Sequence, residues 1–285
     1  MAHSGSIPAL RCEHWQPGGA TGEARLLGGF LRVLELDADD AAGHADAFGR
    51  LRAGELQAIV VHRVYEPAVL AGVVQRLERH DPSFLRTAFP EKFRSWFFGR
   101  NLNLAAPGLP GYFAEAERFH EQLRALFPAE LDPTERVAAL LARLDGGRPF
   151  LPAPGPVAGL RYMFTTLREH AEDGYIPPHF DNEQALRPSF AHLRTVVDRH
   201  MTSFVLVLSA PEGGGALEVF DLAEEPEHVR LMSDDRAGAK PDVSRFASVA
   251  FGLSAGSLIV LDSGRYLHRL TPVRGPRSRW TAWRR

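Results

Sequence analysis

The spacing of apolar residues predicts that the first half of the chain mixes short strands with helices. Apolar runs at Leu31–Leu36 and Gln57–Val64 predict two strands. Pro67 follows the second run, and proline is common at the first position of a helix. Three segments beyond it carry apolar residues at helical spacing, which is typical of amphipathic helices that face a core. They are Val69–Leu77, Tyr112–Phe127 and Val137–Leu144.

The segment Phe89–Leu109, between the first two of these helices, has no clear period. It contains aromatic residues, arginine and asparagine, among them Phe98, Arg100 and Asn101. One interpretation is an irregular surface loop. The other is a wall of a substrate pocket, because binding residues are often carried on loops.

The second half of the chain predicts β-structure. Stretches rich in glycine and proline at 146–149 and 152–156 end the helical part. Short apolar or alternating runs follow, and runs of this kind separated by turns indicate a sandwich or a closed barrel. The predicted strands are Arg161–Arg168, Met201–Ser209, Ala216–Asp221, Ser257–Asp262 and Arg277–Trp283.

This pattern predicts one domain over residues 1–285, in which residues 1–150 support a β-core formed by residues 151–285. Glu212–Gly215 is expected to form a tight turn. Leu222–Ser248 is polar and charged, so we expect a long insertion between strands and a second candidate for a pocket wall.

Composition and charge narrow the class of protein. The chain has 285 residues, 45% of them apolar and 24% charged, as in ordinary globular proteins. A formal net charge of −2 without a basic stripe argues against a nucleic-acid or anionic-membrane partner. No run of 18 apolar residues predicts a membrane span, and the first ten residues lack the pattern of a secretion signal. Cys12 is the single cysteine, so we expect a cytoplasmic protein whose metal ligands, if any, are His, Asp and Glu.

Two His-x-Asp motifs are candidates for metal binding. On a strand, residues i and i+2 point to the same side and can hold one ion, whereas on a helix they diverge by about 200°. His44 and Asp46 lie in an alanine-rich segment that predicts helix, so we discard them. His179-Phe180-Asp181 follows two prolines, which favour extended backbone.

Two histidines and one carboxylate on one face of a metal form the site of non-haem Fe(II) oxygenases. The second histidine is expected from a distant strand, and His268 fits best because it follows the predicted strand at Ser257–Asp262. His200 is its rival. His170 and Glu172 form a His-x-Glu that could replace the first motif.

The segment His268–Arg277 resembles the distal-histidine strand of the Fe(II)/2-oxoglutarate-dependent dioxygenases. The runs Ser203–Ser209 and Gly213–Val219 are similar to the middle strands of the barrel in that superfamily. The similarity covers about residues 160 to 285. It implies a double-stranded β-helix (jelly roll) with helices outside one sheet, and Fe(II), 2-oxoglutarate and O2 as cofactors.

The resemblance also implies roles for individual residues. His179, Asp181 and His268 would hold Fe(II). An arginine about ten residues beyond the distal histidine would bind the far carboxylate of 2-oxoglutarate, since the guanidinium grips a carboxylate at two points. Arg279 is the first choice because Thr281 lies on the same strand face, and Arg277 is the alternative.

Asp181 departs from the related halogenases, in which a small residue at this position lets chloride bind iron. We therefore expect hydroxylation or a related C–H oxidation of a small molecule, with an amino-acid-derived substrate favoured and Phe98, Arg100 and Asn101 in its pocket. Two other classes stay open: a cupin-like metal enzyme of different chemistry, and a non-catalytic binding or sensor module.

Overall fold

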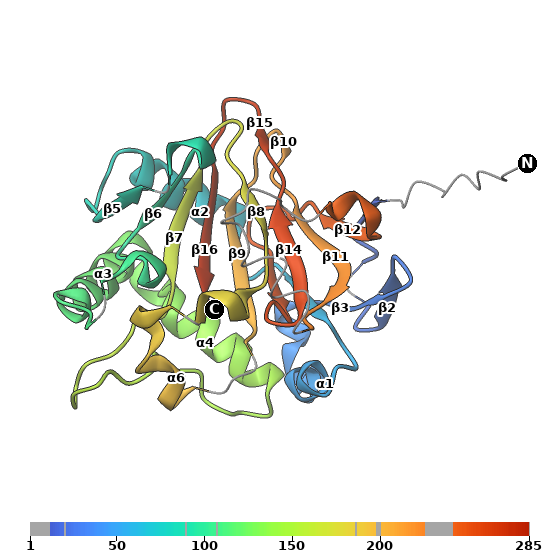
Figure 1. The fold of residues 1–285 in the computed structure, drawn as a ribbon, viewed down its shortest axis with the longest axis horizontal. Helices are drawn as coiled ribbons and strands as arrows, with labels where there is room; N and C mark the ends of the chain where they lie inside the picture. Colours follow the sequence, from blue (N-terminus) through green and yellow to red (C-terminus); the bar gives the residue numbers. More distant parts are fainter. Residues whose placement is uncertain are drawn as a thin grey trace, which may run out of the picture.

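Eight strands of the second half form the two facing sheets of a double-stranded β-helix (Figure 1). The computed structural model describes residues 12–19, 21–88, 90–106, 108–185, 187–197, 201–225 and 242–284. All neighbouring pairs among these eight strands are antiparallel. The first sheet contains, in spatial order, β7 (Thr166–His170), β16 (Arg279–Arg284), β9 (Ser203–Ser209) and β13 (Leu258–Leu261). The second contains β8 (Ile176–His179), β14 (Tyr266–Leu270), β11 (Leu217–Ala223) and β12 (Ser248–Phe251). The prediction of a mainly β jelly roll with flanking helices is confirmed.

Strands from the first half extend both sheets. Three of them join the first sheet beside β13, two join it beside β7, and one pairs with β12, which gives sheets of nine and five strands. In that order they are β4 (Ala58–His62), β3 (Leu31–Asp37) and β2 (Ala24–Leu27), then β6 (Ser95–Phe98) and β5 (Arg86–Ala88), then β1 (Cys12–His14). A separate small ribbon pairs β10 (Gly213–Gly214) with β15 (Val273–Arg274). The two halves of the chain therefore share one large sheet, which is compatible with the single domain that we predict.

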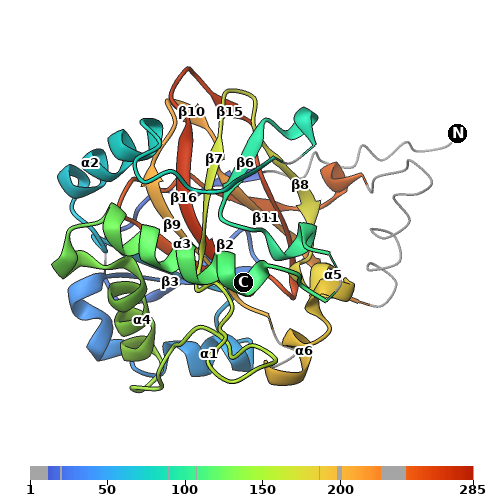
Figure 2. The same ribbon diagram turned by 90° about the vertical axis from the view of Figure 1, so that its left-hand side faces the viewer.

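Helices cover the outer face of the nine-stranded sheet, as Figure 2 shows for α2 (Pro67–Glu78), α3 (Tyr112–Leu126) and α4 (Pro133–Leu144). Proline begins both α2 and α4, and the Asp132 carboxylate caps α4 by accepting from the backbone N–H groups of Thr134 and Glu135. The buried faces of the three helices pack in one cluster with the outer side chains of the sheet. The three amphipathic helices predicted from apolar spacing are confirmed.

The central strands are buried on both faces. In β4, Ile59 and Val61 belong to the outer core under the helices, whereas Ala58 and Val60 belong to the inner core between the sheets. β13 and β9 alternate in the same way. Burial on two sides explains why these strands are continuous apolar runs in the sequence instead of alternating ones.

Two segments differ from expectation. Phe89–Leu109, predicted without regular structure, contains β6, which pairs with β7 in the large sheet. The predicted strand Arg161–Arg168 begins only at Thr166 and runs to His170. Both errors arise because β6 and β7 are specified by pairing with each other across a long sequence separation. In the predicted insertion Leu222–Ser248, residues 226–241 lie outside the described residues.

The remaining helical segments are short, and no described helix is both long enough and apolar enough to cross a membrane. The short segments are η1 (Ala38–His44), α1 (Ala47–Ala53), η2 (Glu91–Phe93), η3 (Leu102–Leu104), η4 (Ala129–Leu131), α5 (Asp181–Ala185), η5 (Pro188–Phe190), α6 (Leu193–Val196) and η7 (Val243–Arg245).

The burial of β9 leads to a prediction about stability. Leu206 is 0% exposed in the outer core, and Leu206→Ala should lower the free energy of unfolding by about 2–5 kcal/mol, because the cavity left by a buried leucine collapses only in part. Leu26 is 56% exposed, and Leu26→Ala should change it by less than about 0.5 kcal/mol. Urea unfolding of both variants measures this. If both variants lost the same free energy of unfolding, packing of Leu206 in the outer core would not contribute more to stability than the exposed Leu26.

Candidate metal centre and cosubstrate cavity

Three side chains converge between the edge strand β8 and its neighbour β14. His179, the last residue of β8, pairs directly with His268 of β14, and their ring centroids lie 4.3 Å apart. Asp181 follows two residues after His179. One ligand atom from each of the three residues lies within 4.8 Å of the other two, and no other trio of His, Cys, Asp or Glu in the described residues meets this condition.

Hydrogen bonds to the backbone orient both imidazoles. Nδ1 of His179 lies 2.9 Å from the Pro177 carbonyl oxygen, and Nδ1 of His268 lies 3.0 Å from that of Tyr266. A carbonyl only accepts, so each Nδ1 carries the proton and each Nε2 presents a lone pair. These Nε2 atoms lie 3.5 Å and 4.0 Å from Oδ1 of Asp181.

The charge balance of this group fits a divalent cation. Asp181 is 0% exposed, and a carboxylate held away from water requires a compensating positive charge. Two neutral imidazole lone pairs beside it complete a nitrogen and oxygen donor set that suits Fe(II). The fixed Nδ1–H bonds are the usual support of metal-binding histidines.

Asp181 does not lie on the strand where we expected it. β8 ends at His179, and Asp181 is the first residue of α5. The chain turns at Phe180, which is fully buried against Phe220, Leu222 and Leu267, and the Asp181 N–H donates to the Ser263 carbonyl at 3.0 Å. The two ligand side chains therefore converge through an anchored turn and not through strand alternation.

The other candidate metal ligands lie away from the converging group or outside the described residues. His44 lies in η1 with Asp46 at the start of α1, as the helical prediction required, and neither belongs to the converging group. His200 lies outside the described residues. His170 is buried on β7 at the far end of the same cavity, and Glu172 is exposed, so the two do not form the alternative metal motif.

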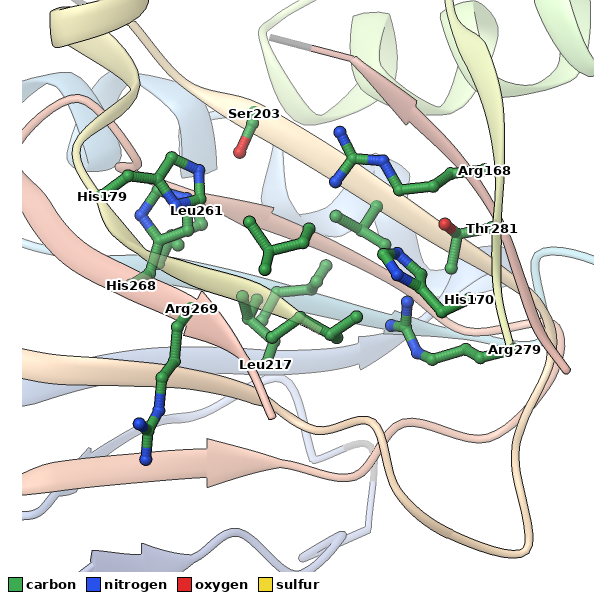
Figure 3. Close-up of a pocket in the computed structure, with 14 residues that line it drawn as sticks. Arg168, His170, His179, Ser203, Leu217, Leu261, His268, Arg269, Arg279 and Thr281 are labelled. Carbon is green, nitrogen blue, oxygen red and sulfur yellow. The ribbon is translucent and has the colours of Figure 1, made fainter. Parts of the chain in front are cut away.

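A cavity between the two sheets connects the converging group to a cationic wall (Figure 3). His179 and His268 line one end. The opposite end is lined by four polar side chains, which are Arg168, His170, Arg279 and Thr281. The sides between them are mainly apolar and include Ile176, Val205, Leu217, Ile259, Leu261 and Leu270.

Arg279 is a buried cation at the far end of this cavity. It is 5% exposed, and burial lowers the pKa of its guanidinium to about 10, so it is still charged at neutral pH. Among the described residues, no carboxylate forms an ion pair with it. Arg269 also lines the cavity, but its Nε donates to Glu218 at 2.6 Å. Arg279 therefore has the environment of a receptor for an anion.

Thr281 and Arg277 lie on either side of Arg279 in the sequence. Thr281 is buried and lines the cavity beside it, as strand alternation predicts. Arg277 precedes β16, is exposed, and lines a different surface hollow with residues of α2. The cavity geometry thus favours Arg279 over Arg277 as the carboxylate anchor.

The three residues predicted for substrate binding do not line this cavity. Phe98 packs in the outer core with its ring 4.9 Å from that of Trp280, so its assignment to a pocket wall is wrong. Asn101 is buried and caps η3 by accepting from the Asn103 N–H at 2.9 Å. A substrate role for Arg100 and Asn101 stays a prediction.

Arg168 and His170 line the cavity, although neither was predicted from the sequence to do so. They stand two apart on β7 and face the same way, directly opposite Thr281 and Arg279 on β16. Arg168 and His170 are two residues apart, a spacing that places both side chains on one face of a strand. The strand itself could not be located from the sequence, because its start depends on pairing with β6 and β16.

Comparison with known proteins agrees with this geometry. A family model described as "carrier-protein-independent halogenase WelO5" matches residues 30–283. The structure of an N-substituted L-amino acid dioxygenase from Burkholderia ambifaria AMMD is 16% identical, with 84% of this chain and 85% of that chain covered. Its TM-score is 0.55, and that of its complex with alpha-ketoglutarate is 0.51. A 2OG-Fe(II) oxygenase family protein from Burkholderia pseudomallei is 14% identical over 96% of this chain and 93% of that chain, with a TM-score of 0.48. No curated protein matches.

At 16% identity the B. ambifaria structures establish a shared fold, whereas the family model spans nearly the whole chain. The chain therefore belongs to the WelO5 family within the Fe(II)/2-oxoglutarate-dependent oxygenases, whose cofactors are Fe(II), 2-oxoglutarate and O2.

Proposed function

We propose that this protein hydroxylates a small molecule and does not halogenate it. The observation that carries the proposal is Asp181, a buried carboxylate whose Oδ1 lies 3.5 Å from Nε2 of His179. The two histidines and this carboxylate would occupy three positions around iron. 2-Oxoglutarate would take two more through its 1-carboxylate and 2-keto oxygens, which leaves one position for O2 and none for a halide ion.

The family match favours halogenation as the second candidate. Halide binding needs an open position where hydroxylases have the carboxylate, and in this chain that position carries Asp181. The buried Phe180 and the backbone hydrogen bond from the Asp181 N–H to the Ser263 carbonyl fix the position of residue 181. A halide would therefore have to displace the carboxylate of a residue whose backbone is anchored.

The chain's own residues would perform the binding and orientation. When bound, Fe(II) with 2-oxoglutarate supplies oxidation of a substrate C–H bond by O2, and 2-oxoglutarate is converted to succinate and CO2. Arg279 and Thr281 would hold the distal carboxylate, so that the keto-acid end points along the cavity toward His179 and His268. The apolar walls exclude water from the space between the two ends.

The buried guanidinium of Arg279 also argues against the two other classes of function, a cupin-like metal enzyme and a non-catalytic sensor module. A cupin-like enzyme of different chemistry or a sensor module would use the histidines. It would not need, at the far end of the cavity, a buried Arg279 that lacks an ion-pair partner among the described residues. The substrate is proposed only as a class. The N-substituted L-amino acids named for the B. ambifaria enzyme are the first class to test, and with a net charge of −2 we propose no nucleic-acid partner.

The metal assignment predicts which variants lose the ion. His179→Ala, Asp181→Ala and His268→Ala should each weaken Mn(II) binding by more than about 100-fold, because removal of a group that only orients a ligand already costs about 10- to 100-fold. Calorimetric titration without O2 measures this. His44→Ala is the matched control and should bind normally. Normal binding by His268→Ala would move the third ligand elsewhere, with His200 next to be tested.

The cosubstrate assignment predicts a difference between two neighbouring arginines. Arg279→Ala should weaken 2-oxoglutarate binding to the Mn(II) protein by at least about 30-fold, since loss of one partner of a buried charge pair costs about 2–5 kcal/mol. Arg277→Ala should bind within about twofold of the original protein because its side chain is exposed. The reverse order would make Arg277 the anchor.

The reaction itself is tested by its products. A screen of amino acids and simple metabolites with Fe(II), 2-oxoglutarate and excess chloride should give one succinate for each hydroxylated product and no chlorinated product. Asp181→Gly should lose hydroxylation and gain a chloride-dependent change in the visible absorption of the anaerobic Fe(II)–2-oxoglutarate complex. A chlorinated product from the original protein would overturn the proposal, as would the absence of any visible band together with the absence of 2-oxoglutarate binding.

A further inference from the structure

His170 is a buried histidine that neither the metal group nor the carboxylate anchor explains. It is 0% exposed and lines the cavity at the end opposite His179 and His268. Within the described part of the chain, neither of its ring nitrogens has a hydrogen-bond partner. In Figure 3 the ring projects into the cavity beside the guanidinium of Arg279.

Such a ring is unusual as a purely structural element. Buried polar side chains are nearly always hydrogen-bonded, and a histidine placed only for packing would have at least one nitrogen satisfied by its surroundings. Because the ring nitrogens of His170 have no hydrogen-bond partner among the described residues and the ring faces the cavity, we expect a ligand in the cavity to supply one. The cosubstrate of the proposed function carries a distal carboxylate whose charge suits this end of the cavity.

Strand register fixes the position of His170 relative to the anchor. β7 and β16 are antiparallel, with His170 opposite Arg279 and Arg168 opposite Thr281. Residues two apart on a strand share a face, and directly opposed side chains have Cβ atoms about 4.5–5.5 Å apart. The four side chains thus form a two-by-two patch on the cavity wall, with His170 the immediate neighbour of the Arg279 side chain.

The charges around His170 determine its protonation state. Burial, and then the nearby Arg168 and Arg279 guanidinium groups, lower the pKa of His170 well below its ordinary value. The ring is therefore neutral at neutral pH, with one N–H donor and one acceptor nitrogen. Arg168 itself is buried with its Cζ 4.1 Å from the ring centroid of Phe97, which holds this cation at the edge of the patch.

A neutral donor in this place suits an anion that a cation already holds. A positive charge on the ring would be repelled by both arginines, whereas a neutral N–H can donate a hydrogen bond to a carboxylate oxygen without that repulsion. Arg279 grips a carboxylate from one side, Thr281 can donate its hydroxyl, and His170 can donate from the adjacent strand.

We propose that His170 donates a hydrogen bond to the distal carboxylate of 2-oxoglutarate and so helps the site select a dicarboxylic 2-oxo acid. This inference rests on the proposed function. It makes His170 a cosubstrate-binding and specificity residue, contributed by β7 and distinct from the anchor on β16.

The test compares two 2-oxo acids on the same variants. 2-Oxopentanoate has the chain length of 2-oxoglutarate but a methyl group in place of the distal carboxylate. Calorimetry with the Mn(II)-loaded full chain, without O2, should show that His170→Phe weakens 2-oxoglutarate binding about tenfold, or about 1.4 kcal/mol, and leaves 2-oxopentanoate binding unchanged. His170→Gln keeps an N–H donor and should stay within about threefold for both acids. His44→Phe, a histidine outside the cavity, is the control.

Several results would overturn the inference. Equal weakening for both acids would assign His170 to packing or to ordered water, and no weakening for either would remove it from the site. If the original protein binds 2-oxoglutarate but His170→Phe binds it equally well, this inference alone fails. If the original protein with metal binds no 2-oxoglutarate, the proposed function fails first.

A second measurement does not depend on the folding of His170→Phe. In the Zn(II)-loaded protein with nitrogen-15-labelled histidine, addition of 2-oxoglutarate should bring out a slowly exchanging ring N–H resonance that is absent from His170→Gln. Addition of 2-oxopentanoate should not produce it. A resonance that appears with both acids, or with neither, contradicts the inference.

Discussion

The antiparallel pairing of β8 with β14 is the constraint on which the site depends. It places His179 directly beside His268, although the two residues are far apart in the sequence. Within each strand, the carbonyl two residues earlier fixes the proton on Nδ1, so the backbone sets both the position and the tautomer of each ring. Only Asp181 lies beyond the strand end, where the buried Phe180 and the hydrogen bond to Ser263 hold it.

The two ends of the cavity carry side chains of opposite charge. A buried carboxylate and two imidazole lone pairs stand at one end, and the Arg168 and Arg279 guanidinium groups stand at the other. Keeping such groups out of water costs free energy unless each meets an opposite charge. In the proposed function, Fe(II) beside Asp181 and a dicarboxylate that reaches Arg279 would place opposite charges at the two ends, so the arrangement would suit Fe(II) and 2-oxoglutarate together. Binding of the two should also raise the stability of the fold by mass action.

The sequence carried enough information for the core architecture and for the converging ligands. The helices from Pro67, Tyr112 and Val137 follow from apolar spacing, which depends only on local residues. His268 and Arg279 could be selected because the resemblance gave their distance from one another. The strand β6 and the exact start of β7 could not be found, because each depends on a partner distant in the chain. Phe98 was misassigned for the same reason: without β6, an aromatic residue beside Arg100 could not be recognised as part of the outer core. The role of His170 needed the register of β7 against β16, which no local pattern contains.

The alternation of β16 ties two layers of the protein together. Arg279 and Thr281 face the cavity, while Trp280 between them faces the outer core and meets Phe98 there. Because Trp280 belongs to the same continuous strand, a substitution that shifts Trp280 under the helices would also shift the Arg279 guanidinium on the opposite face. Packing in the helical layer is therefore expected to influence the far end of the cavity without touching it, so that outer-core residues belong with the lining residues among the positions that tune this end.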